Sequence, residues 1–442
     1  MKINPRIAIP LGMAFLVAAC QASAPAATSD GAAPGESSAP ESEPASTEDS
    51  GEQVTLTFLA GFTGGDRAAY EGLIEEFNAS HPNIQVEMEI QPWDVIGQEL
   101  PAAMATGGGP DIATPSFAEG SIFAYAESGS ILPLDDAYGS GEGLVERDAI
   151  PEAALNAFTY QDQLYAVPAN FATLLLYHNL DLLEEAGLDG PPESMDELRD
   201  YAVQLTESDD AGNVTQHGLV LADHATIPMW PILIWAEGGS IVNEDGCSGL
   251  GSPETIEAVQ TWADLVINEN ISPVGLTGGE ADNLFAAGQA AMEMNGPWAT
   301  GVYTPAGINY DVAPIPEGVA GPVTLATTVP MVLNANTEHP DAAYEFFAWW
   351  TSQEAQGALS LGSGFPPART DMADNAELAE HDWVPKFAAA AADARVYLAG
   401  VEQFTEADTE IFVPAIQRIT RGESAEDVLT QASEELDALL GC

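Results

Sequence analysis

Residues 54–113 alternate strand and helix patterns, and this order constrains the fold more than any other feature of the chain. The stretch 54–60 predicts a short strand, and apolar residues spaced three and four apart within 69–77 predict an amphipathic helix. The stretch 84–90 alternates apolar and polar residues, as strands do, and a second helix then leads to a short strand at 111–113. We therefore expect an α/β fold with a mostly parallel sheet covered by helices.

A second α/β region follows in the sequence, and the length of 442 residues favours two lobes over one. The expected elements are a largely apolar stretch at 164–177 that is extended around Val167-Pro168, helices at 178–186, 195–206, 262–268 and 342–350, and strands at 290–295 and 310–314. Ser194 is a suitable N-cap for the second of these helices. Phe346, Phe347 and Trp350 share one helix face, which we expect to pack in a core.

The first 19 residues predict a signal peptide instead of a part of the fold. Lys2 and Arg6 precede an apolar run at 7–19 that is too short to cross a hydrocarbon core of ~30 Å. The run ends in Leu-Val-Ala-Ala-Cys at 16–20, which resembles a bacterial lipobox, so we expect cleavage before Cys20 and a lipid on that cysteine. The alternative is an ordinary secretory signal followed by a chance cysteine.

Residues 20–53 predict a disordered acidic tether. Beyond Cys20 they contain no aromatic residue and no aliphatic side chain larger than alanine until the folded region begins. Such a segment cannot bury enough apolar surface to offset its ordering entropy. A lipidated cysteine followed by this leash predicts a protein held beside the outer face of the cell membrane.

The charge balance excludes several classes of partner. The chain carries 10 Lys and Arg against 69 Asp and Glu, a formal net charge of −59. Nucleic-acid binding depends on basic side chains, and so does binding to anionic ligands or anionic membranes. An acid-rich lineage and a saline habitat are both compatible with this surplus, because salt screens carboxylate repulsion.

Several short motifs occur in one order along about 300 residues. They are Phe62 to Asp66, Gly109-Pro110-Asp111-Ile112, Leu164 to Pro168, Leu176 to Leu182, Phe285 to Met292 leading into Asn295-Gly296-Pro297-Trp298, and Gly364 to Arg369. In this order they resemble the extracellular solute-binding proteins of ABC importers, in the branch that includes maltose-binding protein. His178 departs from the family, which usually has a second tyrosine there.

The resemblance implies a two-lobed periplasmic-binding-protein fold of type II, with a hinge that the chain crosses more than once. It places lobe 1 at 54–170 plus 315–355 and lobe 2 at 171–312 plus 356–442. A ligand would lie in the interlobe cleft, and hinge closure around it would signal to the permease subunits. We expect a monomer.

The resemblance also supplies candidate ligand-binding residues. Trp298 is expected to stack on a sugar face, with core packing as the alternative, and Trp230 is open between the same two roles. Asp66, in the loop that contains Gly64, can accept sugar hydroxyls or cap the following helix. Trp93 is a further candidate, and Trp235 is expected in the core.

Three polar residues complete the candidate set. Ser116 lies just beyond the strand at 111–113, and Asn170 lies at the expected hinge crossing with both a donor and an acceptor. Arg369 can donate to ligand hydroxyls or pair with a carboxylate that holds the lobes.

The expected function is capture of a neutral carbohydrate without chemical change. The sequence contains no G-x-S-x-G elbow, H-E-x-x-H, Walker A or Rossmann fingerprint, and we expect neither a metal nor a cofactor. His217 and His224 suit surface or capping roles. A polyamine, peptide or glycerol-phosphate ligand is the alternative, and a glycosidase that uses two of the many carboxylates is a more distant one.

Cys247 and Cys442 remain once Cys20 is assigned to lipid. Outside the cytoplasm disulfides persist, and the family layout places both cysteines in lobe 2. We therefore expect a disulfide between them, with two unpaired thiols as the alternative.

Overall fold

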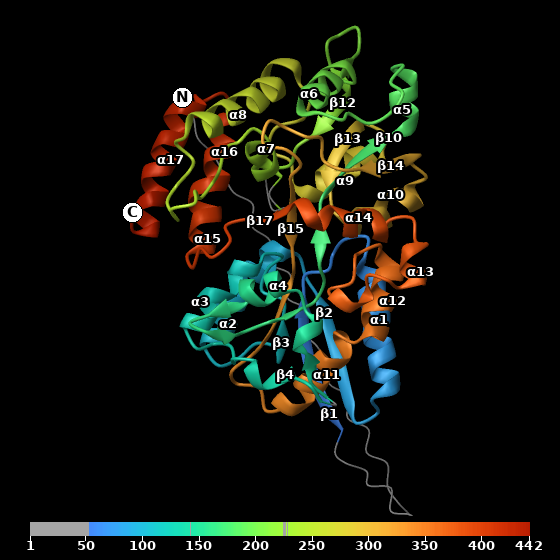
Figure 1. Cartoon of the computed structure of the whole chain (residues 1–442), viewed down its shortest axis with the longest axis vertical. Helices are drawn as coiled ribbons and strands as arrows, with labels where there is room; N and C mark the ends of the chain where they lie inside the picture. The colour runs from blue at the N-terminus through green and yellow to red at the C-terminus, as the bar shows by residue number, and fades with distance from the viewer. Residues whose placement is uncertain (1–52, 142, 224–226, 228) are drawn as a thin grey trace, which may run out of the picture. The chain divides into compact units, whose positions relative to one another are not determined.

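The computed structural model of the chain describes residues 53–141, 143–223, 227 and 229–442 (Figure 1). The predicted signal peptide, the lipid on Cys20, nearly all of the tether and His224 lie outside the described residues. Buried apolar side chains form two large cores. Core 1 contains residues mainly from 56–169 and 329–359, and core 2 contains residues mainly from 174–325 and 387–436.

The sheet of core 1 has the strand order β2-β1-β3-β16-β8. Its strands are β1 (Val54–Ala60), β2 (Ile84–Ile90), β3 (Ile112–Ala113), β8 (Val167–Pro168) and β16 (Pro330–Leu333). The helices of this half include α1 (Arg67–Ser80), α2 (Trp93–Ala105), α11 (Pro340–Trp350) and α12 (Gln353–Ser363). β1 pairs in parallel with β2 and β3, whereas β16 runs antiparallel to β3 and β8.

The sheet of core 2 has the strand order β11-β12-β13-β10-β14. Its strands are β10 (Leu175–Asn179), β11 (Glu207–Ser208), β12 (Val214–Val220), β13 (Ala290–Asn295) and β14 (Tyr310–Ala313). The helices include α5 (Leu180–Glu185), α6 (Met195–Gln204), α7 (Trp230–Ala236), α8 (Pro253–Asp264), α9 (Gly278–Ala286), α10 (Thr300–Ala306), α16 (Val413–Ile419) and α17 (Ala425–Leu440). β12 and β13 are parallel, and β10 runs antiparallel to both of its neighbours.

Both sheets are therefore mixed instead of mostly parallel, although the α/β class and the strand–helix alternation at 54–113 are confirmed. In core 1 both antiparallel pairs involve β16, the strand through which the chain returns to this sheet from core 2.

Two chain segments pass between the cores side by side. β9 (Ala172–Thr173) pairs antiparallel with β15 (Thr324–Thr327), which also pairs with β17 (Ala394–Val396). Just beyond, Thr328 Oγ1 donates to the carbonyl of Asn170 at 2.6 Å, and the backbone N–H of Val329 donates to Asn170 Oδ1 at 3.2 Å. These contacts tie the two crossing segments to one another.

The lobe boundaries stay a prediction, but core membership bears on them. Ile315, Val323 and Leu325 pack in core 2, and Val329 packs in core 1. This distribution favours a second crossing near residue 327 over one near residue 315.

The helix expected at 178–186 begins later than the sequence suggests. His178 is buried and belongs to β10, where it pairs with Met292 of β13 and Asp311 of β14. The Asn179 side chain accepts hydrogen bonds from the N–H groups of Asp181 and Leu182, so it caps α5. Ladder pairing on both sides holds His178 in an extended conformation.

Candidate functional site

A cavity of about 220 Å³ is lined by residues of both cores and of the crossing segments. The core 1 half contributes loop residues 61–64, Asp66 and Trp93, and the core 2 half contributes Met229, the N-terminus of α9, Asp282, Asn295 and Trp298. Asn170, Ala172, Thr327 and Val329 come from the crossings, and Phe117 and Phe365 complete the aromatic lining. Five candidate residues named from the sequence therefore meet at one place: Gly64, Asp66, Trp93, Asn170 and Trp298.

Asp66 faces the cavity without acting as a helix cap. It precedes α1, but its carboxylate makes no capping hydrogen bond. The side chain is only 7% exposed, and loss of hydration raises its pKa to about 7. A Cβ on Gly64 would lie 2.7 Å from Asp66 Oδ1, so a side chain at this position would displace the carboxyl group. A buried carboxyl that lacks a cap role is suited to accept hydroxyl donors from a ligand.

Trp298 is partly buried beside Phe365, with 6.1 Å between the ring centroids. Its ring lies over Gly296, where a Cβ would come within 2.1 Å of the indole. The glycine therefore leaves room for the ring at the cavity wall. Trp93 lies in the same way over Gly61, at 2.1 Å from the equivalent Cβ position.

Asn170 lines the cavity, but its side chain also holds the crossing. The Nδ2 group donates to Tyr70 Oη at 2.6 Å, and Oδ1 accepts from Val329. Asn170 is 5% exposed, so this amide joins α1, the first crossing and the second crossing in one buried cluster.

Ser116 lies in a second, larger cavity of about 790 Å³. This cavity is lined by α2, by residues 115–130 and by a stretch of core 2 that includes Phe404 and Asp408. Trp93 and Phe117 line both cavities, and their rings pack edge to face with 6.1 Å between centroids. The two cavities are therefore neighbours on either side of this aromatic pair.

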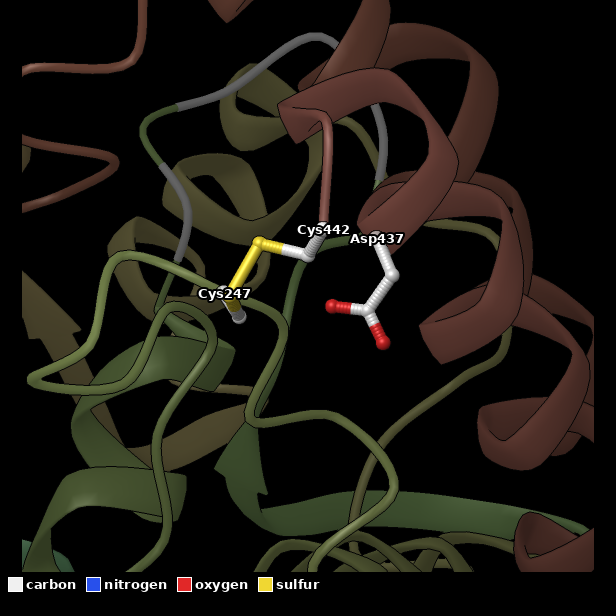
Figure 2. A group of neighbouring side chains, drawn as sticks. All are labelled: Cys247, Asp437 and Cys442. Carbon is white, nitrogen blue, oxygen red and sulfur yellow. A yellow bond between two sulfur atoms is a disulfide. The ribbon is translucent and has the colours of Figure 1, made fainter.

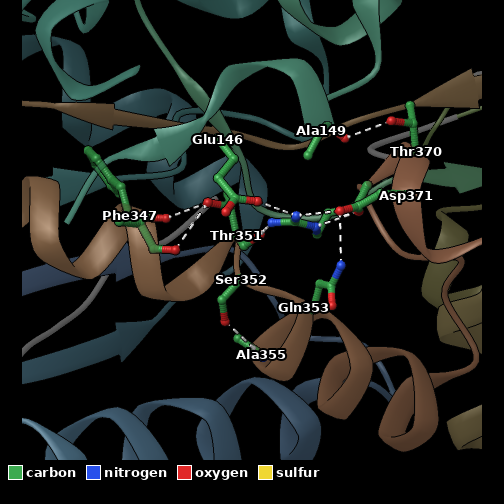
Figure 3. A network of polar contacts seen from close by, with 11 residues as sticks. Glu146, Ala149, Phe347, Thr351, Ser352, Gln353, Ala355, Thr370 and Asp371 are labelled. Carbon is green, nitrogen blue, oxygen red and sulfur yellow. Dashed lines mark hydrogen bonds and ion pairs between the residues drawn. The ribbon is translucent and has the colours of Figure 1, made fainter. Parts of the chain in front are cut away.

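Arg369 does not line either cavity and forms an ion-pair network instead (Figure 3). Its Nε and Nη2 donate to the two oxygens of Asp371 at 2.8 and 2.7 Å, and Nη2 also pairs with Glu146. Nη1 donates to the carbonyl of Thr351 at 2.6 Å. The contacts of Arg369 therefore support pairing with carboxylates instead of donation to ligand hydroxyls.

Trp230 starts α7 and is 3% exposed within core 2. The cavity lining includes its neighbour Met229 but not Trp230. The whole of α7 is buried, so the tryptophan packs with the rest of the helix. Trp235 also lies in core 2, as expected.

Asp282 and Asn295 also line the cavity, and the sequence patterns did not single them out. Asn295 Nδ2 donates to Asp282 Oδ1 at 2.7 Å and to Glu293 Oε1 at 3.2 Å. The available signal was Glu293 itself, an acidic residue in the otherwise apolar stretch Ala290 to Met294 of a buried strand.

The ionisable acidic and basic side chains among the described lining residues of both cavities are all carboxyl groups. Among the described residues that line them, none is Lys, Arg or His. Asp66, Asp94, Asp282 and Asp408 are present. The site therefore offers hydrogen-bond acceptors and aromatic faces, and it disfavours a ligand with negative charge.

Cys247 and Cys442 are joined by a disulfide with 5.9 Å between their Cα atoms (Figure 2). Asp437 lies beside them, and the three side chains are close enough to resemble a metal site. Sulfurs that are bonded to one another are not thiolate ligands. Asp437 Oδ1 instead accepts from the backbone N–H of Ser248 at 2.8 Å and so fastens α17 to the loop that carries Cys247.

This arrangement, with two mixed α/β halves and an aromatic, acidic cavity at the chain crossings, is typical of a solute-binding protein. The chain matches the family of bacterial extracellular solute-binding proteins over residues 63–357, and it belongs to that family. In the described part of the chain no helix is both long and apolar enough to span a membrane.

Individual proteins that are similar to this chain include several whose names give a sugar as the ligand. A maltotriose-binding protein of Pyrococcus abyssi is 26% identical over 326 residues, covering 70% of this chain and 65% of that protein. An arabinooligosaccharide-binding protein of Bacillus subtilis is 25% identical over 357 residues, with 74% and 76% covered. A tagatose-bound solute-binding protein of Thermotoga lettingae shares the fold, with a TM-score of 0.78 at 24% identity over 88% of this chain and 100% of that one.

Proposed function

We propose that the chain is the membrane-tethered substrate-binding component of an ABC importer, which captures a neutral carbohydrate and delivers it to the permease. The lining of the 220 Å³ cavity carries this proposal. Trp93, Trp298 and Phe365 offer flat apolar faces for sugar C–H groups, and Asp66 and Asp282 offer acceptors for hydroxyls.

The absence of basic lining residues in the described part of the chain argues against a glycerol-phosphate ligand, because the charged lining groups are all carboxyl groups, which repel a phosphate. A polyamine would satisfy the carboxylates and is therefore the alternative that the binding experiment includes. A glycosidase would also need two carboxyl groups that flank a bond. The maltotriose-binding and arabinooligosaccharide-binding relatives are named as binding proteins, so we expect the ligand to be released chemically unchanged.

The larger cavity favours an oligosaccharide over a single sugar. It adjoins the smaller one at Trp93 and Phe117, and it contributes further hydroxyl and carboxyl groups, among them Ser116 and Asp408. A ligand of two or more units would reach from one cavity into the other past the aromatic pair. The names of the maltotriose-binding and arabinooligosaccharide-binding relatives agree with this size.

The remaining parts of the proposal concern placement and motion. Cys20 would hold the protein to the outer face of the cell membrane through lipid, and the monomer would dock on the permease after closure. The paired crossings at Asn170 and Thr328 are suited to be the hinge, because both segments pass between the two cores and are hydrogen-bonded to one another.

The experiment is a thermal-shift screen of the lipid-free mature chain against glucose, maltose, maltotriose, arabinotriose, mannotriose, spermidine and glycerol 3-phosphate. A ligand of the native state raises the melting temperature. We expect a shift with at least one sugar and none with glycerol 3-phosphate. A shift with spermidine alone would replace the carbohydrate by a polyamine, and steady hydrolysis of the bound sugar, followed by chromatography, would overturn the binding-protein role.

A further inference from the structure

Four polar side chains form a buried cluster directly behind the wall of the small cavity. Glu293 lies on β13 between Met292 and Met294 and is 0% exposed. The Tyr303 hydroxyl on α10 donates to Glu293 Oε2 and lies 3.3 Å from Asp282 Oδ1. Asn295 Nδ2 lies within hydrogen-bond distance of all three other members, at 2.7 Å from Asp282, 3.2 Å from Glu293 and 3.1 Å from Tyr303.

Only one side of this cluster reaches the cavity. Asp282 and Asn295 belong to the cavity lining, whereas Glu293 and Tyr303 do not. Asp282 is partly buried on α9, and the two inner groups are held between β13, β10 and α10. The cluster thus presents a carboxyl group to a ligand and supports it from behind.

The two carboxyl groups cannot both be charged at low cost. Burial raises the pKa of Glu293 well above its ordinary value, and the neighbouring Asp282 raises it further. Burial also raises the pKa of Asp282, but hydrogen bonds from Asn295 and Glu293 lower it in part, and the Tyr303 hydroxyl lies 3.3 Å from Asp282 Oδ1. Glu293 is fully buried, whereas Asp282 reaches the cavity, so the proton belongs on Glu293, which hydrogen-bonds to Asp282, and the negative charge belongs on Asp282.

Asp66 lines the same cavity, and because its pKa is about 7 it gains charge within the tested pH range, equally in the wild type and in a Glu293 variant. The titratable groups that face the pair are Tyr303 on α10 and Tyr177 on β10, with Tyr310 of β14 next to Tyr177. Burial raises the pKa of each of these tyrosines, so all three stay neutral. No basic side chain of the described residues interacts with either carboxyl group.

We propose that Asp282 is a ligand-contacting residue of the cleft and that Glu293, which does not reach the cavity, is its positioning residue through a shared proton. The proposal rests on the proposed function, because it assigns a hydroxyl-accepting role within the same site. It selects ligands that present a hydrogen-bond donor to α9, and it makes their affinity depend on pH. Protonation of Asp282 at low pH removes the charged acceptor, and loss of the Glu293 proton at high pH sets two charges side by side.

Binding is measured by calorimetry between pH 5 and pH 9, with whichever of maltotriose, arabinotriose and mannotriose gives the largest thermal shift. Asp282→Asn is expected to weaken binding at least tenfold at pH 7.5. Glu293→Gln keeps an acceptor toward Tyr303 and a donor toward Asp282, and it loses the 3.2 Å bond from Asn295, which keeps its 2.7 Å bond to Asp282. Its affinity at pH 7.5 is therefore expected within threefold of the wild type. Its profile is expected to lose the decline at high pH. Glu257→Gln, on the exposed face of α8, is the matched control with an unchanged profile.

Two results would overturn the proposal: an Asp282→Asn affinity within twofold of the wild type, or a Glu293→Gln profile that keeps the decline at high pH. If the wild type binds no sugar, the proposed function fails together with the ligand contact of Asp282. In that case the melting temperature of the ligand-free protein still tests whether Glu293 and Asp282 share a proton. A raised carboxyl pKa costs stability as pH rises, so Glu293→Gln should melt about 2 °C or more above the wild type at pH 8 and equal to it at pH 4.

Discussion

Gly65 and Gly301 meet backbone to backbone, so closely that a Cβ on Gly301 would lie 2.3 Å from the carbonyl oxygen of Gly65. Gly65 belongs to the loop that leads from β1 to α1, and Gly301 lies in the first turn of α10. The contact therefore joins the half of the molecule built on core 1 to the half built on core 2. It lies next to the cavity residues Gly64, Asp66 and Trp298.

A methyl group at this contact should weaken ligand binding. In Gly65→Ala the new Cβ would lie 2.5 Å from the Gly301 backbone, which cannot yield as a flexible side chain would, so the two halves must separate. We expect at least a tenfold loss of affinity in calorimetry, with each half still folded by circular dichroism. Gly72→Ala, where a Cβ meets nothing within 4 Å, is the control. Unchanged affinity in Gly65→Ala would mean that binding does not require this approach.

Trp298→Ala tests the aromatic wall. Loss of the ring should weaken sugar binding by ~1–3 kcal/mol, the order expected for a buried aromatic contact. Trp349→Ala removes a ring of similar burial that packs on Phe77 and His81 outside the cavity lining, so it should leave the affinity unchanged. If the two variants bind equally well, Trp298 is a packing residue.

Much of this architecture follows from local patterns in the sequence. The strands β1, β2 and β13 and the helices α1, α6 and α11 follow from residue periodicity, and the loops at Gly64 and Trp298 follow from motif order. Those signals are local because each element is defined by its own apolar face.

The unpredicted parts depend on contacts between distant residues. Arg369 and Glu146 are 223 residues apart, so the sequence could not choose between an ion pair and a ligand contact for Arg369. For a similar reason the sequence does not distinguish sugar stacking from core packing for Trp230, since the burial of its ring depends on how the whole of α7 packs. Asp282 was missed because its partners Glu293 and Tyr303 lie on other elements, and only the acidic residue within an apolar strand pointed to them.

Asp66→Asn should separate binding from stability. Because burial raises the Asp66 pKa to about 7, the folded protein prefers the neutral carboxyl group. The resulting stability is fully present below the ordinary pKa of 3.8 and is lost as the pH rises toward 7. The ligand-free Asp66→Asn variant should therefore melt above the wild type at pH 8 and equal to it below pH 4.

The same variant should bind sugar more weakly at pH 8, because an amide replaces the charged acceptor. Melting curves across pH and calorimetry at pH 8 measure the two effects separately. A variant that is less stable than the wild type at pH 8 would show that Asp66 has a structural partner, and full affinity would remove it from the ligand site.

Low salt should destabilise the protein. The net charge is −59, and exposed ion pairs such as Arg67–Glu71 and Arg418–Glu423 offset little of the repulsion. Lowering the ionic strength from physiological to 0.01 M lengthens the screening distance from ~8 Å to ~30 Å. The melting temperature should fall in this range and recover in moderate NaCl. A constant melting temperature across the series would mean that the carboxylates are already far enough apart.

The Cys247–Cys442 disulfide should carry a large part of the stability of the C-terminal helix. The bond closes a separation of 195 residues and holds the end of α17 beside the loop at Cys247. In the chain-entropy model such a loop contributes on the order of 5 kcal/mol, and measured values are often lower. Cys442→Ser should therefore lower the melting temperature under non-reducing conditions but not in excess reductant, where the wild type loses the same bond.

Alkylation of the lipid-free mature chain without reductant, followed by mass spectrometry, should find no free thiol at either cysteine. Two alkylated thiols would contradict the bond, and an equal melting temperature for wild type and Cys442→Ser would show that Asp437 and the packing of α17 suffice to hold this end of the chain.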